Sequence, residues 1–331
     1  MRVYSPNNEL RGLHALSDRR HTFVAAPAEA EIILVLLPWK DGRQIEIHEL
    51  VALCPHKCFV VSTTDLPQYT AHGIYSTVSG FWGTFGNRIR SGSYQIGAKR
   101  FKNPFIEGEQ IGSGTACSKK YLFSFVGRDC HPTRQALLNI QWQRSDVLIE
   151  DSSKTFALWD ENRNGQQTVQ RQQYFCDLLR QTKFALCPRG VGPNSIRLFE
   201  AMKLGVAPVI ISDGWKFPLG PRWRDFSIVV PEKQVWELER IVGEREHEYQ
   251  AMGQRAAAAY EAFFSEHAYF NFLVENCLDI MRRQWLPERF ARTVIKISHL
   301  LNSLGKQARK RAGIRTRLMR ILDVLRGWPS C

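Results

Sequence analysis

Short apolar runs, separated by polar and glycine-rich segments, alternate along this chain with stretches of helix-forming residues. The apolar runs are short and rich in β-branched residues, as is typical of strands buried on both faces of a parallel sheet. The runs that predict strands are 31–37, 57–62, 74–78, 121–126, 146–149, 184–187, 206–211 and 227–230. Helical patterns are expected at 44–53, 196–204, 236–268 and 270–285. This alternation predicts an α/β protein.

Residues 183–220 combine a strand, a loop, a helix and a second strand in quick succession. After the apolar run 184–187, Pro188 and the glycines that follow indicate a turn, and Ser195 is a good residue to begin a helix. Gly205 stands where the end of that helix favours a positive φ angle. A helix that begins at the carboxyl end of a parallel strand directs free N–H groups, and the positive end of its dipole, toward an anion.

Three charged residues of this segment suit a nucleotide ligand. Arg189 in the loop and Arg197 on the first helical turn each carry a guanidinium suited to bidentate contact with phosphate oxygens. Glu200 lies further along the same helix and is either the ion-pair partner of these arginines or an acceptor for sugar hydroxyls. For Arg189, a purely structural salt bridge within the loop is the alternative.

The same segment resembles the exostosin family of glycosyltransferases. The matching residues are Pro188-Arg189-Gly190, Ser195-x-Arg197-x-x-Glu200-Ala201, Pro208-Val209-Ile210 and Ser212-Asp213-Gly214-Trp215, followed by Pro218. A second similar piece lies upstream, in the strand Phe123-Ser124-Phe125-Val126-Gly127-Arg128 and in Arg134 at the start of an expected helix. The resemblance covers about residues 121–264 and implies a set of donor-binding residues: Gly127, Arg128, Arg134, Arg189, Gly190, Asn194, Ser195, Arg197, Glu200, Asp213 and Gly214. Arg189 is also expected to act in catalysis, and Asp213 is alternatively a plain turn residue.

The length of 331 residues suits two domains of ordinary size, and the resemblance implies the GT-B arrangement. In that arrangement two Rossmann-like α/β domains face each other across a cleft. We expect an acceptor-side domain at 1–118, a nucleotide-sugar-binding domain at 119–285 and a basic helical tail at 286–331. Residues 79–118 are expected to form long loops and a hinge, and 270–285 to close the second domain.

The net charge of +13 is concentrated at the end of the chain. Residues 292–331 carry ten Lys and Arg residues against the single acid Asp323. Ile314, Leu318, Ile321, Leu322 and Leu325 share one helical face there. This pattern favours a basic amphipathic helix on an anionic membrane surface, with a helix packed on the protein as the alternative. Because the rest of the chain is close to neutral, a nucleic-acid partner is not expected.

Composition also limits cofactors and location. The eight cysteines include no CxxC pair, so free thiols are expected, and Cys54-Pro55-His56-Lys57-Cys58 lacks the further ligands of a zinc site. No Asp-x-Asp motif occurs, so we expect sugar transfer without a metal ion or other cofactor. No apolar run is long enough to span a membrane and no secretory signal is visible, which predicts a cytoplasmic protein, possibly peripheral at the membrane.

Glycosyl transfer also requires a general base for the acceptor hydroxyl. Asp65, which follows the predicted strand 57–62 in the first domain, is the main candidate, and an Asx turn before Pro67 is the alternative role. His72 is a second candidate base. Arg90 is a candidate contact for an anionic sugar or phosphate.

These features support an inverting glycosyltransferase that moves a sugar, most simply from a uridine diphosphate sugar, to a polysaccharide or glycolipid acceptor. The inverting stereochemistry is implied by the resemblance alone, as is a possible glycosyltransferase partner. The alternative is a non-catalytic subunit that binds a nucleotide sugar or a glycan. Such a subunit would keep the loop with Arg189 and Glu200 but lack a working base.

Overall fold

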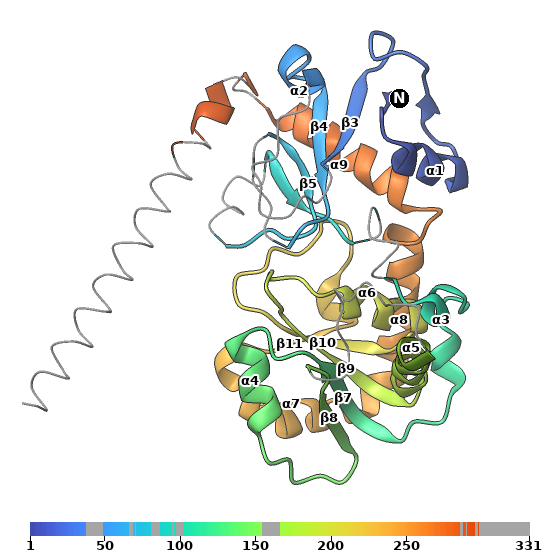
Figure 1. Ribbon diagram of the computed structural model, residues 1–331, viewed down its shortest axis with the longest axis vertical. Coiled ribbons are helices and arrows are strands. Elements are labelled where there is room, and N and C mark those ends of the chain that lie inside the picture. Colours follow the sequence, from blue (N-terminus) through green and yellow to red (C-terminus); the bar gives the residue numbers. More distant parts are fainter. Residues whose placement is uncertain are drawn as a thin grey trace, which may run out of the picture.

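The computed structural model describes residues 1–37, 49–65, 69, 71–80, 87–94, 96, 102–153, 166–284, 287–288, 290–294 and 297. Within these residues the chain forms two parallel β-sheets, one built from the first part of the sequence and one from the middle (Figure 1). The prediction of two Rossmann-like α/β halves is confirmed. The expected boundary at 118/119 lies in the connection between the two sheets.

The first sheet has the strand order β2-β1-β3-β4-β5-β6. Its strands are β1 (Arg2–Tyr4), β2 (Thr22–Phe23), β3 (Ile32–Leu37), β4 (Cys58–Ser62), β5 (Gly73–Tyr75) and β6 (Ile89–Ser91). β3, β4 and β5 lie where the apolar runs predicted them. β1, β2 and β6 are too short to give a periodic pattern, and β6 lies inside the stretch expected to be loops.

The second sheet has the order β11-β10-β9-β7-β8. Its strands are β7 (Tyr121–Gly127), β8 (Val147–Asp151), β9 (Thr182–Pro188), β10 (Ala207–Ile211) and β11 (Ile228–Val229). The chain order reverses between β7 and β9, and the carboxyl ends of strands at such a switch point form a crevice where ligands bind in open α/β sheets. All five predicted strands of this half are present.

Helices cover both sheets and link their strands. The α-helices are α1 (Asn8–Leu16), α2 (Glu49–Leu53), α3 (Pro104–Glu107), α4 (Pro132–Asn139), α5 (Gln166–Arg180), α6 (Ile196–Leu204), α7 (Leu238–Glu244), α8 (Tyr249–Phe263) and α9 (Tyr269–Arg283). Short 3₁₀ helices span Ser113–Ala116, Trp223–Asp225, Glu232–Glu237 and Glu246–Glu248. The helical stretch expected at 236–268 is therefore broken into several shorter elements.

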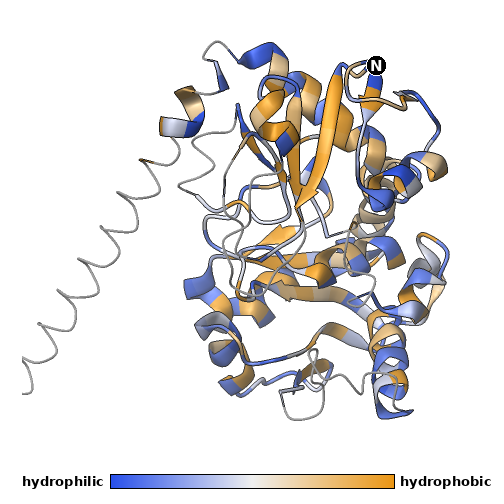
Figure 2. Cartoon of the chain, turned by 45° about the horizontal axis from the view of Figure 1, so that its top comes forward, coloured by the Kyte–Doolittle hydropathy of each residue, from blue (hydrophilic) through white to orange (hydrophobic). Residues whose placement is uncertain are grey.

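The core follows the alternation of side chains along each strand. In β3, Ile32, Leu34 and Leu36 join one buried cluster, while Ile33 and Val35 join another on the opposite face. The strands are accordingly hydrophobic and the outer faces of many helices are polar (Figure 2). Because both faces of the strands are buried, these runs are continuously apolar rather than alternating.

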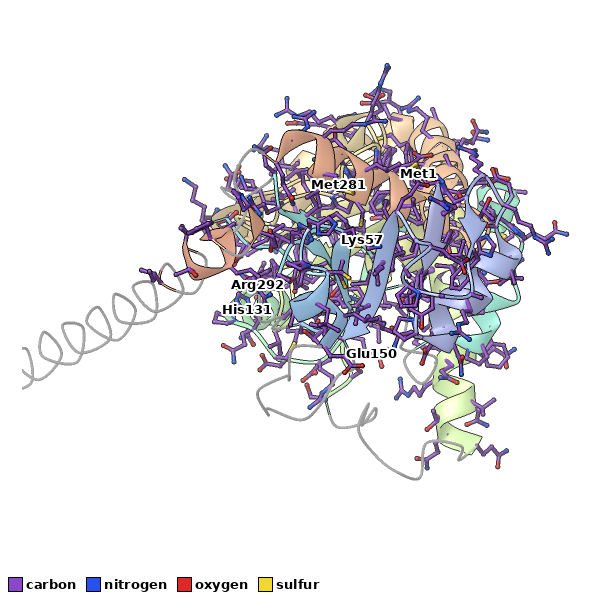
Figure 3. All side chains as sticks on the ribbon, turned by 90° about the horizontal axis from the view of Figure 1, so that it is seen from above. Met1, Lys57, His131, Glu150, Met281 and Arg292 are labelled. Atoms are coloured by element: carbon purple, nitrogen blue, oxygen red, sulfur yellow. The ribbon has the colours of Figure 1, made fainter. Side chains whose placement is uncertain are left out.

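The last helix differs from the prediction. Residues 270–285 were expected to close the second domain, but α9 packs against β3, β5 and α1 of the first half. Figure 1 shows α9 beside β3 and β5, and Figure 3 labels Met281 of α9 and Lys57 before β4 in the view from above. The apolar face of α9, with Phe270, Leu273 and Cys277 buried, fits the open face of the first sheet, which the local sequence cannot indicate.

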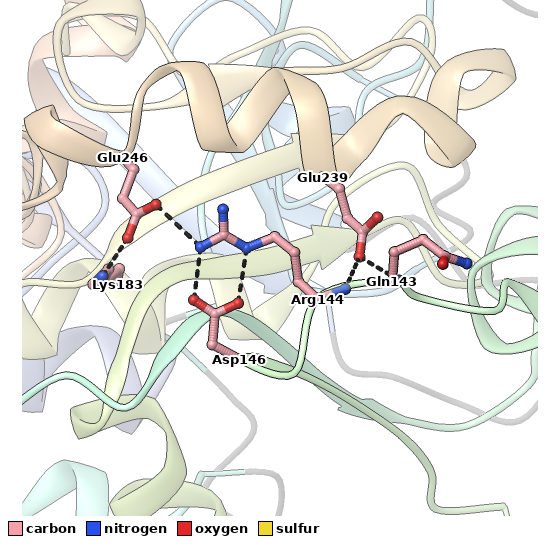
Figure 4. A network of polar contacts seen from close by, with 6 residues as sticks. All are labelled: Gln143, Arg144, Asp146, Lys183, Glu239 and Glu246. Atoms are coloured by element: carbon pink, nitrogen blue, oxygen red, sulfur yellow. Dashed lines mark hydrogen bonds and ion pairs between the residues drawn. The ribbon is translucent and has the colours of Figure 1, made fainter.

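A network of charged side chains stabilises the second half at the end of the sheet away from the strands' carboxyl termini (Figure 4). Arg144 donates to both carboxylate oxygens of Asp146, at 2.8 and 2.7 Å, and also to Glu246. Glu246 in turn pairs with Lys183 at the start of β9. The side-chain hydrogen bond and charge of Arg144 lower the pKa of Asp146. These contacts hold the 3₁₀ and helical segments after β11 against the strands that position the site.

Candidate active site

The β9–α6 unit forms as the sequence predicts. β9 ends at Pro188, α6 begins after Ser195, and Gly205 takes a left-handed conformation with φ of 71° at the helix C-terminus. Ser195 makes no side-chain capping hydrogen bond to α6. The first turn of α6 therefore directs free backbone N–H groups and the positive end of the helix dipole into the crevice.

Arg134 joins the two loops of the switch point. Its guanidinium donates to the carbonyl oxygens of Arg189 at 2.9 Å, Pro188 at 3.2 Å and Arg128 at 3.4 Å. Burial lowers its pKa. The backbone carbonyls thus occupy this side chain, which fixes the shape of the Pro-Arg-Gly loop. Gly190 lies against it, since a Cβ atom there would be 3.3 Å from Nη2 of Arg134.

Arg189 faces a carboxylate that sequence analysis missed. Nη1 of Arg189 is 3.6 Å from Oε1 of Glu232, which begins the 3₁₀ helix after β11. The same Glu232 accepts from the backbone N–H of Asp213 at 2.8 Å and from the hydroxyl of Thr133 at 2.6 Å. Asp213 Oδ1 accepts in return from the backbone of Glu232, and Gly214 turns the chain with φ of 74°. The sequence signal for Glu232 was its position two residues after the predicted strand 227–230.

Arg197 is held inside the protein at the carboxyl end of β7. Its guanidinium donates to the carbonyl of Val126 and stacks over the rings of Phe125 and Phe175, at 4.6 and 5.3 Å from their centroids. Burial lowers its pKa to about 10, so the group stays charged at neutral pH. Gly127 leaves room for this arrangement, because a Cβ atom there would lie 2.6 Å from the Phe125 ring.

Three buried guanidinium nitrogens in this crevice lack a hydrogen-bond partner among the described residues. They are the Nε atoms of Arg128, Arg189 and Arg197. A buried donor without a partner is costly, and on a charged group it is most readily satisfied by an anion. Together with the N-terminus of α6, these groups form what we call the cationic cradle: residues 127–128, 189–190 and 194–197.

Glu200 borders a small cavity beside the cradle. The cavity holds about 30 Å³, enough for one or two water molecules, and is also lined by Tyr94, Lys102, Glu107 and Lys203. Burial raises the pKa of Glu200 to about 7, Arg197 partly offsets this, and Glu107 adds to it. The carboxyl group of Glu200 has no hydrogen bond or ion pair within the described part of the chain, so it keeps its full acceptor capacity for a ligand.

The structure brings Asp65 to the cradle from the other half of the molecule. Asp65 follows β4, is exposed, and its Oδ1 accepts a hydrogen bond of 2.6 Å from the hydroxyl of Tyr94. Gly192 of the cradle loop packs on its backbone, since a Cβ atom at Gly192 would be 2.7 Å from the Asp65 carbonyl oxygen. Pro67, and with it the expected Asx turn, lies outside the described residues.

Backbone contacts fix the two halves against each other around this point. The side-chain amide of Asn194 donates to the carbonyl of Ser76 at 2.7 Å, and the backbone N–H of Lys216 donates to Val78 at 2.9 Å. Ser79 and Trp215 form an isolated antiparallel bridge. The loops at the carboxyl ends of both sheets therefore meet.

His72 and Arg90 are not part of this site. His72 is fully buried, bonds to the carbonyl of Cys58 at 2.8 Å and lies 3.4 Å from Glu288, and burial lowers its pKa to about 3. An imidazole with these contacts is a core group, so the prediction of His72 as a base is wrong. Arg90 pairs with Asp279 and Asn276 of α9 and thus anchors that helix to the first half.

The described residues contain no group of three His, Cys, Asp or Glu side chains placed to hold a metal ion. No helix within them is both long enough and apolar enough to cross a membrane. From residue 298 onward, the basic tail and its predicted helix lie outside the described residues.

The middle of the chain matches a known protein family. Residues 98–244 match the family model described as the Exostosin GT47 domain. Exostosin-1b of Danio rerio is 24% identical over 188 residues, which is 55% of this chain and 24% of that protein. The probable glucuronoxylan glucuronosyltransferase IRX7 of Arabidopsis thaliana is 41% identical over 78 residues, 22% of this chain and 17% of that protein. The chain thus spans about a quarter or less of the length of these relatives.

Among solved structures, the chain is similar to WaaG, a glycosyltransferase involved in lipopolysaccharide biosynthesis. The TM-score is 0.36 and the identity 13%, over 86% of this chain and all of the other. The cradle residues, from Gly127 to Arg197, all lie inside the region that the family model matches. Residues 98–244 are therefore similar to the glycosyltransferase domain of the exostosin family.

Proposed function

We propose that this protein is an inverting glycosyltransferase that moves a sugar from a nucleoside diphosphate sugar to a hydroxyl group of a glycan or lipid-linked acceptor. The observation that carries the proposal is the cationic cradle at the switch point of the second sheet. It combines the N-terminus of α6 with three buried guanidinium nitrogens that have no partner among the described residues. A diphosphate satisfies such donors and complements the helix dipole.

The same geometry suggests how the residues act during transfer. Asp65 accepts the proton of the acceptor hydroxyl as the oxygen attacks the anomeric carbon. The bond from that carbon to the diphosphate oxygen breaks, and the electron pair leaves with the diphosphate. Arg189 and the α6 N-terminus stabilise the negative charge that grows on the leaving group. One displacement inverts the anomeric configuration, and these residues require no metal ion for the step.

Glu200 is assigned to the donor as an acceptor for ribose hydroxyls. Its carboxyl group is without a partner among the described residues and lies in the same helix as Arg197. The cavity at Glu200 holds only about 30 Å³, so the proposal includes a wider separation of the two halves when the donor enters. Similarity to the exostosin family supports a nucleotide-sugar donor, and uridine diphosphate is the first nucleotide to test.

The experiment is a panel of nucleotide sugars, assayed for thermal stabilisation and then for release of free nucleoside diphosphate with glycan acceptors. Arg189→Ala is expected to abolish stabilisation by the true donor. Lys233→Ala, an exposed cation next to Glu232 but outside the cradle, serves as the control. If Arg189→Ala binds every donor as the parent does, the cradle is not the donor site. Donor binding without diphosphate release would identify the chain as a non-catalytic nucleotide-sugar-binding subunit instead.

The sequence of the tail supports membrane attachment as part of the proposal. Ten basic residues in 292–331 suit an anionic lipid surface, where a glycolipid acceptor would also lie. Liposome binding by the full chain, compared with a chain ending at residue 297, tests this.

A further inference from the structure

A second recess, which we call the hinge groove, lies where the chain passes from α8 of the second half to α9 of the first. It is a cavity of about 450 Å³, and the cationic cradle contributes none of its lining residues. Its walls come from Asp18 and Arg20 before β2, from residues 261–263 and 267–268 around the α8–α9 connection, and from α9. Leu219 and Gly220 close the side that belongs to the second half. The volume falls within the about 300–1,000 Å³ that is typical of ligand sites.

One wall of the groove is a set of planar polar side chains in fixed positions. Asp18 accepts from the amide of Asn271 at 2.7 Å and from Arg20 at 2.6 Å. Arg20 also lies 3.7 Å from Glu275. Further along α9, Asp279 holds Arg90 and Arg283. Because partners on the protein hold these groups in place, they present ordered hydrogen-bonding edges to a ligand.

The carboxylates of this wall keep acceptor capacity. Among the described residues, Glu275 makes only the long contact to Arg20, and its side chain is 55% exposed. Glu261 forms no side-chain hydrogen bond or ion pair within the described part of the chain and is exposed. A carboxylate accepts several hydrogen bonds in its own plane, which suits a pair of neighbouring hydroxyl groups.

Another part of the lining is apolar. Leu219 is 54% exposed, although it is a large aliphatic side chain. Gly220, with φ of 114°, packs against the ring of Phe263, since a Cβ atom at Gly220 would come within 2.6 Å of it. A recess that combines apolar surface with planar hydrogen-bonding groups suits a sugar ring, which has carbon-bound hydrogens on its faces and hydroxyls around its edge.

The charges around the groove select among sugars. Four carboxylates line it, those of Asp18, Glu261, Glu275 and Asp279, together with the guanidinium groups of Arg20 and Arg90. Arg283 pairs with Asp279 from outside the lining, so negative charge is still in excess by one. His267 also lines the groove, and its Nδ1 is 2.7 Å from the carbonyl of Leu16. The excess of negative charge disfavours uronic acids and sulfated sugars. We propose that the hinge groove binds a short segment of a neutral glycan, at a site separate from the donor cradle.

A chain of hydrogen bonds connects α9, which lines the hinge groove, to Asp65 of the candidate active site. Tyr269, the first residue of α9, accepts a hydrogen bond from the backbone of Ser93 at 2.9 Å, and the neighbouring Tyr94 bonds to Asp65. A glycan that spans Leu219 and α9 contacts both halves, so its binding biases how they sit together. The site stands on its own lining residues and does not depend on donor binding.

The test uses the full chain without nucleotide and a panel of neutral tetrasaccharides of glucose, xylose, mannose and galactose, with tetragalacturonate as the anionic arm. Binding is measured by saturation-transfer NMR and calorimetry. Leu219→Trp fills the groove from an exposed position and is expected to weaken binding at least about tenfold. Leu53→Trp, at a 71% exposed position on α2, is the matched control and should bind as the parent does.

Glu275→Ala is the second variant, because it removes carboxylate acceptors without touching the core, and Glu244→Ala, on an exposed glutamate of α7, is its control. The proposal predicts that at least one neutral tetrasaccharide binds and that both groove variants weaken it. It is overturned if no neutral member binds, if tetragalacturonate binds in preference, or if Leu219→Trp leaves the affinity unchanged. Thermal stabilisation by uridine diphosphate, recorded on the same samples, reports on the donor cradle separately.

Discussion

Replacing Glu200 by glutamine is expected to stabilise the protein at alkaline pH and to weaken donor binding at the same time. The substitution keeps the shape of the side chain and removes its charge. Burial beside a cavity of about 30 Å³ raises the pKa of this carboxyl from 4.5 to about 7, with Arg197 offsetting part of the effect. The site thus carries a charge that the folded protein disfavours, as is typical of functional carboxylates.

The magnitude follows from linkage between protonation and folding. Below pH 4.5 the carboxyl group is neutral in both the folded and the unfolded chain, so it does not lower the free energy of unfolding. Between pH 4.5 and about 7 it ionises only when the chain unfolds, and the folded state loses stability as the pH rises. Above that range the free energy of unfolding is lowered by at most about 3 kcal/mol. A loss of about 1–3 kcal/mol is expected, because the side chain borders a cavity.

Urea unfolding of the parent and of Glu200→Gln, each at about pH 5 and pH 8, measures this cost. The difference in unfolding free energy between variant and parent should shift by about 1–3 kcal/mol in favour of the variant at the higher pH. Glu244→Gln, whose side chain is 62% exposed, is the matched control and should show no such shift. If this difference shifts by less than about 0.5 kcal/mol for Glu200→Gln, burial does not disfavour the charged form of Glu200 and the reasoning is refuted.

The same variant tests the role of Glu200 toward the donor. Hydrogen bonds to a charged group are worth about 1.5–3 kcal/mol, so losing the carboxylate should weaken donor binding about ten- to hundredfold. Calorimetry with the donor from the nucleotide-sugar panel gives the value. A stabilised variant with unchanged donor affinity would separate the two effects and remove Glu200 from the donor site.

Three further outcomes are expected. Glu232→Gln removes the carboxylate charge that lies 3.6 Å from Arg189. Diphosphate affinity should change less than about tenfold, and the unfolding midpoint should fall. A complete loss of diphosphate binding would show that Glu232 contacts the donor itself. Gly192→Ala places a Cβ atom 2.7 Å from the carbonyl oxygen of Asp65 and should therefore push the two halves apart. Turnover should fall more than donor affinity, and equal effects on turnover and affinity would contradict this. Ending the chain at residue 297 should abolish binding to anionic liposomes and leave turnover of a soluble acceptor intact, and retained liposome binding would place the contact elsewhere.

The β9–α6 unit of the proposed donor site could be predicted from sequence because its residues are close together in the chain. Pro188, the glycine-rich loop, Ser195 and Gly205 each have a local conformational reason, and together they predicted β9, the loop and α6. Glu232 was missed because it reaches Arg189 only when β11 lies beside β10, a pairing that no local pattern encodes.

Other predictions failed for related reasons. His72 had the chemistry of a base, but it became a core residue once α9 and the segment with Glu288 covered β5. Helix 270–285 was correctly predicted as a helix and misplaced, because an amphipathic face specifies that it must be buried but not which sheet buries it.

The amino-acid sequence by itself determined the local elements: apolar β-branched strands, a helix with its caps, and the positive charges of the cradle loop. Only the tertiary structure decided which of these charges stay available for the proposed ligand. It pairs Arg134 with backbone carbonyls and leaves nitrogens of Arg128, Arg189 and Arg197 without a partner among the described residues. It also brought Asp65 to that loop and formed the hinge groove. Backbone preference and hydrophobic periodicity act over a few residues, whereas a site between two halves depends on contacts between residues far apart in the chain.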